Sequence, residues 1–96
     1  MMNLIDNEGQ KQYEYHIENH IARVEYIKAQ TQIYLTHTEV PKELGGKGIG
    51  SSLVKAVLED IKAKDLTLVP LCPFVAMYIK NNPEWRELVL KGINIK

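Results

Sequence analysis

The chain has 96 residues, of which 45% are hydrophobic and 25% are charged, and twelve basic residues balance twelve acidic ones. This length predicts a single small domain over residues 1–96, with the composition of an ordinary soluble globular protein. The zero net charge gives no indication that the surface as a whole binds nucleic acid, because neutralising a phosphate backbone needs clustered Lys and Arg. Any anion that this chain recognises must therefore be bound locally.

The cysteine count and the first residues bear on the cellular compartment. Cys72 is the only cysteine, so neither an intrachain disulfide nor a zinc knuckle is expected. Residues 1–6 lack the basic stretch and the apolar run of a signal peptide, and no segment reaches the length of a membrane span. We therefore expect a cytoplasmic protein that contacts neither membranes nor nucleic acid.

The first forty residues show the alternation of an antiparallel β-meander. Strands are predicted over residues 13–17, 21–27 and 32–40, with a weaker prediction at residues 4–5. In the third long strand, Ile33 and Leu35 are expected to be buried. Pro41 ends that strand, because proline cannot donate a hydrogen bond to a ladder.

A helix is predicted directly after the glycine-rich hexapeptide at residues 45–50. Apolar side chains recur at helical spacing and share one face: Ile49, Leu53, Val54, Val57, Leu58 and Ile61. Charged side chains fall on the opposite face: Lys55, Glu59, Asp60 and Lys62. Asp65 is expected just past the end of this helix.

The remaining residues complete the predicted fold. Residues 66–70 form a short apolar run typical of a buried strand, which should lie parallel to the strand at 32–40 because a helix crossover joins the two. A second helix begins near Pro73 and ends at residues 81–83, and the tail at 84–96 is expected to pack back on the sheet. The predicted fold class is α/β (α+β in layer terms), with a mixed sheet whose antiparallel meander precedes the parallel strand pair.

The glycine-rich segment is the feature most informative about function. Its glycines at the start of a helix leave backbone N–H groups free at the positive end of the helix dipole, which makes an anion site, most often for phosphate. The spacing excludes a P-loop, because Gly50 is followed by two serines rather than by Lys-Ser or Lys-Thr. It also excludes a dinucleotide fingerprint, whose third glycine slot is occupied by Ser51. A flexible turn that only leads into the helix is the alternative.

The same segment resembles the acetyl-CoA signature of the GNAT N-acetyltransferase superfamily, in the pattern Val40-Pro41-x-x-Leu44-x-Gly46-Lys47-Gly48-Ile49-Gly50-Ser51-x-Leu53-Val54. Blocks at residues 36–41 and 69–79 narrow the resemblance to the short YjdJ-like, or N-acetyltransferase domain-containing, branch. The resemblance covers residues 13–85. Two features depart from the superfamily: Gly45 replaces the usual Arg or Gln, and the helical pair that walls the acceptor site in many relatives is missing.

The resemblance implies that the chain binds acetyl-CoA largely through its main chain. Glu39 and Val40 would pair with the pantetheine arm, and the N–H of Thr38 would point at the thioester carbonyl. N–H groups of the glycine loop would hold the pyrophosphate, with Lys47 adding positive charge. The implied cofactor-binding residues are Thr38, Glu39, Val40, Gly45, Gly46, Lys47, Gly48, Ile49, Gly50 and Ser51.

Acyl transfer to an amine needs a base for the attacking nitrogen and an acid for the leaving thiolate. The resemblance places Tyr78 where the family's tyrosine acid stands, although a buried tyrosine that only packs is the alternative. His37 or Glu39 is the candidate base, and simple solvation of both is the alternative. Cys72 lies between a strand end and a helix start, where a thiol can become reactive and accept the acetyl group, whereas most free cysteines are small buried hydrophobes.

We therefore hypothesise an acetyl-CoA-binding protein that acts as an N-acetyltransferase on an amine of unidentified kind. A non-catalytic acyl-CoA-binding or sensing module, self-acylated at Cys72, is the second hypothesis, and a scaffold without ligand is the third. No metal site is predicted, because His16, His20 and His37 lack a second ligand at a suitable spacing.

Overall fold

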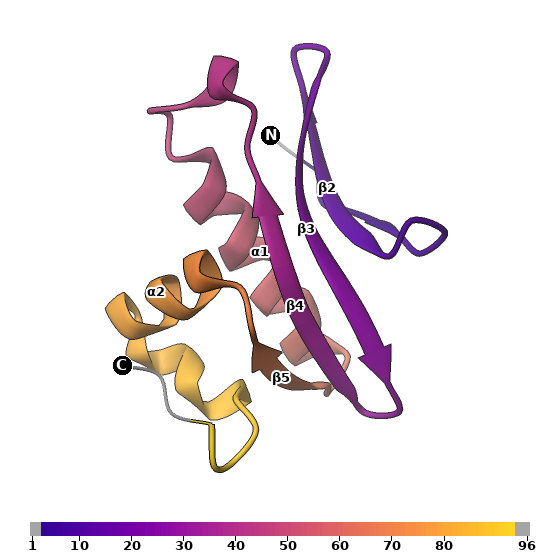
Figure 1. The fold of residues 1–96 in the computed structure, drawn as a ribbon, viewed down its shortest axis with the longest axis vertical. Coiled ribbons are helices and arrows are strands. Elements are labelled where there is room, and N and C mark those ends of the chain that lie inside the picture. Colours follow the sequence, from indigo (N-terminus) through magenta and orange to yellow (C-terminus); the bar gives the residue numbers. More distant parts are fainter. Residues whose placement is uncertain (1–2, 94–96) are drawn as a thin grey trace.

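The computed structural model describes residues 3–93 and shows a five-stranded mixed sheet (Figure 1). The strands lie side by side in chain order: β1 (Ile5–Asn7), β2 (Gln12–Ile17), β3 (His20–Ala29), β4 (Gln32–Glu39) and β5 (Thr67–Pro70). The first four are antiparallel, and β4 and β5 are parallel. The helices are η1 (Lys42–Leu44), α1 (Ile49–Ala63), α2 (Pro73–Asn81) and η2 (Pro83–Leu88). The predicted fold class is confirmed, and the strands begin and end within one or two residues of their predicted limits.

Helix α1 supplies much of the core. It connects β4 to β5 and packs on one face of the sheet, which we call the inner face, against side chains such as Tyr13 and Val24 (Figure 1). All six apolar residues predicted to share a helix face are buried: Ile49, Leu53, Val54, Val57, Leu58 and Ile61. The 3.6-residue period therefore identified the buried face of α1 correctly.

One residue of α1 differs from its predicted position. Asp60 was expected on the solvent side, but its carboxylate accepts a hydrogen bond from the hydroxyl of Tyr13 at 2.7 Å and pairs with Lys64 at 2.8 Å. The ring of Tyr13 is fully buried, and a buried phenol hydroxyl needs a partner. Asp60 therefore lies at the edge of the buried face and joins α1 to β2.

Strand β4 contains a β-bulge. Glu25 of β3 lies opposite His37, but the next residue, Tyr26, lies opposite Leu35, so that Thr36 is an extra residue in β4. The hydroxyl of Thr36 donates to the carbonyl of Glu25 at 3.2 Å. Unbroken alternation would place His37 on the same face as buried Leu35, whereas the bulge turns it away, because one extra residue exchanges the two faces of a strand.

The C-terminal part packs beside β5. Val75 and Ile79 are the buried residues of α2. Beyond η2, Val89 forms a parallel bridge with Leu68, and the N–H of Leu90 donates to the carbonyl of Leu68 at 2.8 Å. The expected return of the tail to the sheet is therefore confirmed for the described residues, while residues 94–96 of that prediction lie outside them.

The opposite side of the sheet, which we call the outer face, carries no helix over β2, β3 and β4 within residues 3–93 (Figure 1). Strand β1 leads directly into β2 through residues 8–11, so the helical pair whose absence was expected from the sequence is indeed not present between them. The described helices include none long and apolar enough to cross a membrane.

Candidate functional site

The glycine loop lies between η1 and α1 and is fixed at both ends. Leu44, the last residue of η1, is buried, and Ile49 begins the buried face of α1. Between them Gly46 and Gly48 have positive φ angles of 77° and 71°, and Gly48 is the residue that precedes the first turn of α1. Residues with a side chain adopt this backbone conformation less readily, so glycine is favoured at these two positions.

The loop presents a run of unpaired donors. Among residues 3–93, no hydrogen bond is accepted from the N–H groups of Gly46 through Ser51, and no side chain caps α1. The pairing resumes at Ser52, whose N–H donates to the carbonyl of Gly48 at 3.0 Å. On the other side, the N–H of Gly45 already donates to the carbonyl of Lys42 at 3.0 Å. Six consecutive donors therefore lack a partner among the described residues at the positive end of a helix dipole, which suits an anion.

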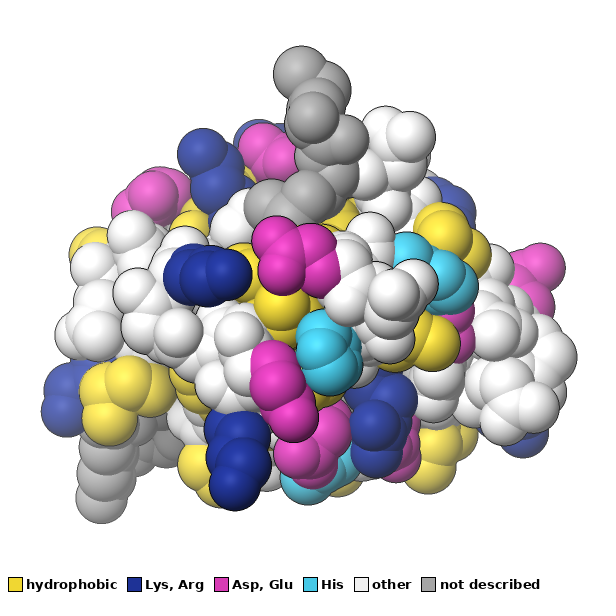
Figure 2. Space-filling model, turned by 90° about the horizontal axis from the view of Figure 1, so that it is seen from above, with side chains coloured by type: hydrophobic (Ala, Val, Ile, Leu, Met, Phe, Trp, Pro, Cys, Tyr) yellow, Lys and Arg dark blue, Asp and Glu magenta, His cyan; other side chains and the backbone are white. Residues whose placement is uncertain are grey.

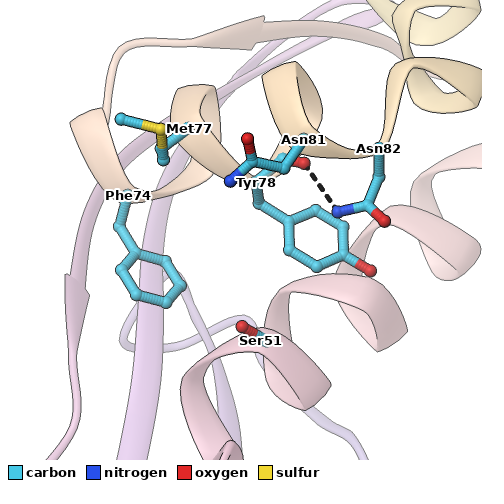
Figure 3. A pocket seen from close by; sticks show the side chains of 6 residues that line it. All are labelled: Ser51, Phe74, Met77, Tyr78, Asn81 and Asn82. Atoms are coloured by element: carbon cyan, nitrogen blue, oxygen red, sulfur yellow. Dashed lines mark hydrogen bonds between the residues drawn. The ribbon is translucent and has the colours of Figure 1, made fainter.

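Two adjoining hollows lie over this loop. One, of about 290 Å³, is lined by Val40 and by residues of η1, the loop and the start of α1. The other, of about 390 Å³, lies between α1 and α2 and is lined by Ser51, Phe74, Met77, Tyr78, Asn81 and Asn82 (Figure 3). Ser51 and Phe74 line both, and a Cβ atom added at Gly50 would come within 2.9 Å of the Phe74 ring. The Phe74 ring therefore rests on the first turn of α1 and separates the two hollows.

Strands β4 and β5 diverge beside this loop. Their pairing ends where Leu35 meets Pro70, and the carbonyl of Leu35 accepts hydrogen bonds from the N–H groups of both Leu71 and Cys72. Beyond that point, β3 is the only strand among residues 3–93 that pairs with β4 as it continues to Glu39, while the chain after β5 turns into α2. The result is a wedge with an open edge of β4 on one side and the start of α2 on the other.

Cys72 and Thr38 meet at the closed end of this wedge. Cys72 directly precedes α2 and is 3% exposed. Its Sγ lies 3.2 Å from Oγ1 of Thr38, so the structure brings together two of the residues that the sequence singled out. Burial among apolar side chains agrees with the interpretation of Cys72 as a small buried hydrophobic residue. Its contact with Thr38 nevertheless places it where the wedge closes.

His37 and Glu39 occupy the outer face on either side of Thr38. Nε2 of His37 lies 3.0 Å from Oε1 of Glu39, and the two side chains are 51% and 49% exposed. The bulge at Thr36 produces this arrangement, since it turns His37 and Glu39 outward and Thr38 inward, opposite Val24. The candidate base is thus an exposed histidine–carboxylate pair at the rim of the wedge.

Tyr78 lies on α2, in the hollow that contains Ser51 (Figure 3). Burial is the main cause that raises its pKa, and the carboxylates of Glu84 and Glu59 raise it further, against a smaller opposing effect of a hydrogen bond with Trp85. The phenol therefore keeps its proton at neutral pH. No hydrogen bond within residues 3–93 joins Tyr78 to Thr38 or Cys72, so the structure does not bring the candidate acid into contact with the closed end of the wedge.

Comparison with known proteins identifies the family. Residues 12–88 match the family model described as GCN5-related N-acetyl-transferase. The chain belongs to this family. It is 37% identical over 59 residues to protein NATD1 of Xenopus tropicalis, an alignment that covers 62% of this chain and 53% of that relative. It is 41% identical over 49 residues to protein NATD1 of Homo sapiens, which covers 51% of this chain and 43% of the relative. The chain spans about half the length of the curated relatives it matches.

Membership of the GCN5-related N-acetyltransferases confirms the resemblance found in the sequence and indicates an acetyl-transfer function. The matched region includes the glycine loop, the wedge and both flanking blocks. It also includes parts of the site that sequence analysis missed, chiefly the bulge at Thr36 and the hollow formed by α2. The spacing of Phe74, Met77 and Asn81 places them on one side of a helix, but only the packing of α2 beside α1 shows that this side lines a hollow.

Proposed function

We propose that this protein binds acetyl-CoA and transfers its acetyl group to an amine. The observation that carries the proposal is the run of six N–H groups from Gly46 to Ser51 without a partner in the described part of the chain, placed beside the open wedge between β4 and β5. In a member of an acetyltransferase family, these donors are suited to the pyrophosphate of the cofactor. Lys47 in the same loop adds a positive charge. Gly45 can contribute to pyrophosphate binding only through its main chain, and its N–H already donates to the carbonyl of Lys42.

The wedge supplies a route from the loop to the reacting carbonyl. Beyond Leu35, the edge of β4 has no strand partner on the β5 side, so an extended ligand with amide groups can add to it as a strand would. The pantetheine arm has two such amides. We therefore infer that it lies along Val40 and Glu39 and brings the thioester to Thr38, whose N–H would stabilise the negative charge on the carbonyl oxygen.

The proposed reaction is direct transfer within a complex of both substrates. The lone pair of the acceptor nitrogen attacks the thioester carbonyl carbon, the C–S bond breaks, and the sulfur leaves with the electron pair. The His37–Glu39 pair takes the proton from nitrogen, and Tyr78, held protonated by its raised pKa, is the proposed proton donor to the thiolate. We place this reaction in the cytoplasm, where the single thiol of Cys72 stays reduced.

A second function is favoured by the position of Cys72. Its Sγ lies 3.2 Å from the hydroxyl of Thr38, next to where the thioester would stop. A thiolate at this place can attack the carbonyl carbon itself, so that a new thioester forms on Cys72, the bond to the CoA sulfur breaks, and CoA leaves as a thiolate that takes its proton from water. The protein would then be an acyl-CoA-binding or sensing module that is acylated on Cys72.

The first test of the proposal is a calorimetric titration of the protein with acetyl-CoA, with CoA and ATP as comparison ligands. We expect acetyl-CoA and CoA to bind and ATP to bind much more weakly, because ATP lacks the pantetheine arm that pairs with β4. Absence of heat with acetyl-CoA would refute the assignment of the glycine loop.

The second test separates the two functions by measuring the release of free CoA with and without added amines. Release that requires an amine supports N-acetyl transfer. A single equivalent of CoA released without amine, and lost in Cys72→Ala, supports acylation of Cys72. Intact-mass measurement of the protein shows directly whether an acetyl group has been gained.

A further inference from the structure

The outer face of the sheet is bare and adjoins the proposed acetyl-transfer site. Alternation along β3 directs Ile21, Arg23, Glu25 and Ile27 to this face, whereas the residues between them are buried against the core. Ile21 and Ile27 are 42% and 54% exposed. These two apolar side chains stand singly at either end of a row of charged ones, so the charges determine what this face can bind.

The charged side chains of the outer face form an ordered array on three strands. Glu14 of β2 lies opposite Arg23 of β3, and Arg23 lies opposite Glu39 of β4. In the next row Glu25 lies opposite His37. Within β3, Nε of Arg23 donates to Oε2 of Glu25 at 2.9 Å. Seen from the end of the molecule that carries the glycine loop, acidic, basic and His side chains are interspersed (Figure 2).

Negative charge predominates in this array. Glu14, Glu25 and Glu39 face a single guanidinium, that of Arg23, which leaves two negative charges in excess while the histidines are neutral. Glu14 is nearly fully buried, accepts hydrogen bonds from Asn7 and Gln12, and has Nε2 of His16 2.7 Å from its Oε1, so it acts at a distance through its charge. The more exposed Glu25 and Glu39 are available for contact.

The array also reaches the reacting position of the proposed mechanism. Glu39 and His37 belong to it, and they flank Thr38, whose hydroxyl contacts Cys72 on the inner side of the sheet. A cationic group held by Glu25 and Glu39 on the outer face would therefore lie next to the rim of the wedge.

We propose that the outer face docks the acetyl acceptor and that this acceptor is a lysine side chain within a basic polypeptide segment. The inference rests on the proposed acetyl transfer. The excess carboxylates complement a cationic segment, and Ile21 and Ile27, six residues apart along β3, span roughly 20 Å, which an extended peptide of about six residues matches. Small amines are instead bound in concave pockets, whereas this face is the open surface of a sheet.

The test measures binding of two fluorescein-labelled peptides by anisotropy, independently of turnover. Both peptides carry one central Lys and flanking Leu residues, and they differ only in having Arg or Glu at the remaining positions. Glu25→Gln removes a carboxylate of the array, and Arg23→Gln removes its cation. Glu87→Gln is the matched control, because it changes net charge equally but lies in η2, paired with Lys62 of α1.

We expect the Arg-containing peptide to bind more tightly than the Glu-containing one, with a difference that shrinks at high salt. Its dissociation constant should rise about two- to five-fold in Glu25→Gln, fall by a similar factor in Arg23→Gln and stay unchanged in Glu87→Gln. Equal affinity for the two peptides, or equal effects of Glu25→Gln and Glu87→Gln, would overturn the inference. So would full displacement of the peptide by spermidine at equal concentration, since that indicates a site for small polyamines.

These experiments distinguish failure of the proposed acetyl transfer from failure of the proposed acceptor site. Without acetyl-CoA binding in the calorimeter, acetyl transfer is refuted, yet the anisotropy measurement still reports whether the outer face binds the basic peptide. Conversely, binding of acetyl-CoA together with equal peptide affinities leaves the proposed function in place and rejects only this acceptor.

Discussion

Gly48 is the residue on which the proposed pyrophosphate site most directly depends. Its φ of 71° orients the free N–H groups around it, and a Cβ atom added there meets no atom within 4 Å. Any effect of a side chain therefore arises from backbone strain and from obstruction of the ligand rather than from a clash inside the protein. This distinction makes Gly48 a cleaner probe of the loop than Gly50, where an added Cβ would meet Phe74.

We predict that Gly48→Val lowers the affinity for acetyl-CoA on the order of ten- to a hundred-fold, because charge-assisted hydrogen bonds to the pyrophosphate are lost. The strained backbone should cost about 1–2 kcal/mol of stability and leave the fold intact. Calorimetry and thermal unfolding measure the two effects. Gly92→Val is the control, since Gly92 also has a positive φ and an open environment but lies outside the loop. Unchanged affinity in Gly48→Val would refute the loop assignment.

Tyr78 provides the second prediction for a single residue. If its protonated phenol donates to the leaving thiolate, Tyr78→Phe removes one oxygen and should lower kcat on the order of a hundred-fold. The dissociation constant of acetyl-CoA should change little, because the aromatic ring that lines the hollow remains. Single-turnover kinetics and calorimetry give the two quantities. A parallel loss in both would assign Tyr78 to packing alone, as would a kcat equal to that of the unmodified protein.

Among the elements, α1 and the parallel β4–β5 pair were predictable, and the bulge in β4 was not. The six apolar residues of α1 recur with a strong period, and a helix crossover between two strands leaves little freedom in their direction. The bulge could not be predicted from the sequence, because threonine is tolerated on either face of a strand. The pattern around Thr36 and Thr38 therefore gives no sign of an extra residue. Yet it is the bulge that places His37 and Glu39 on the outer face.

The link between α1 and β2 gives a prediction at the scale of elements. Burial alone would raise the pKa of Asp60, but hydrogen bonds from Lys64 and Tyr13 outweigh burial and hold it below its ordinary value of 3.8. A carboxylate with a depressed pKa in the folded state stabilises the fold fully above the unfolded-state value, and this stabilisation is lost as the pH falls through the folded-state pKa.

Asp60→Asn should therefore lower the free energy of unfolding by about 1 kcal/mol at neutral pH, where the charged hydrogen bonds are lost. The difference from the unmodified protein should begin to shrink as the pH falls below 3.8 and should vanish only below the lower folded-state pKa of Asp60, where the carboxyl is uncharged like the amide. Urea unfolding at a series of pH values measures this difference. Glu59→Gln, which changes the adjacent exposed carboxylate, should show no comparable effect. A difference that stays constant with pH would contradict the assigned role of the Asp60 charge.

At the scale of the whole molecule, the described residues are compact, and the edges of their sheet are the feature to explain. The radius of gyration is 12.7 Å, close to the value of about 12.5 Å expected for a single compact domain of this length. One edge of the sheet is the short strand β1, and the other, β5, is protected by Val89 and Leu90. The tail after η2 therefore covers a strand edge that would otherwise be open to another chain.

Truncation after Leu88 tests this role of the tail. It removes the hydrogen bond from Leu90 to Leu68 and the packing of Val89 on the core, which together should cost roughly 1–2 kcal/mol. For a domain of this size, the midpoint of thermal unfolding should fall by about 5–10 °C. Exposure of β5 should also make the truncated chain associate at high concentration, which size-exclusion chromatography detects. Truncation after Ile93 keeps these contacts and should leave both properties unchanged, and if the two truncations behaved alike, protection of β5 by the tail would be wrong.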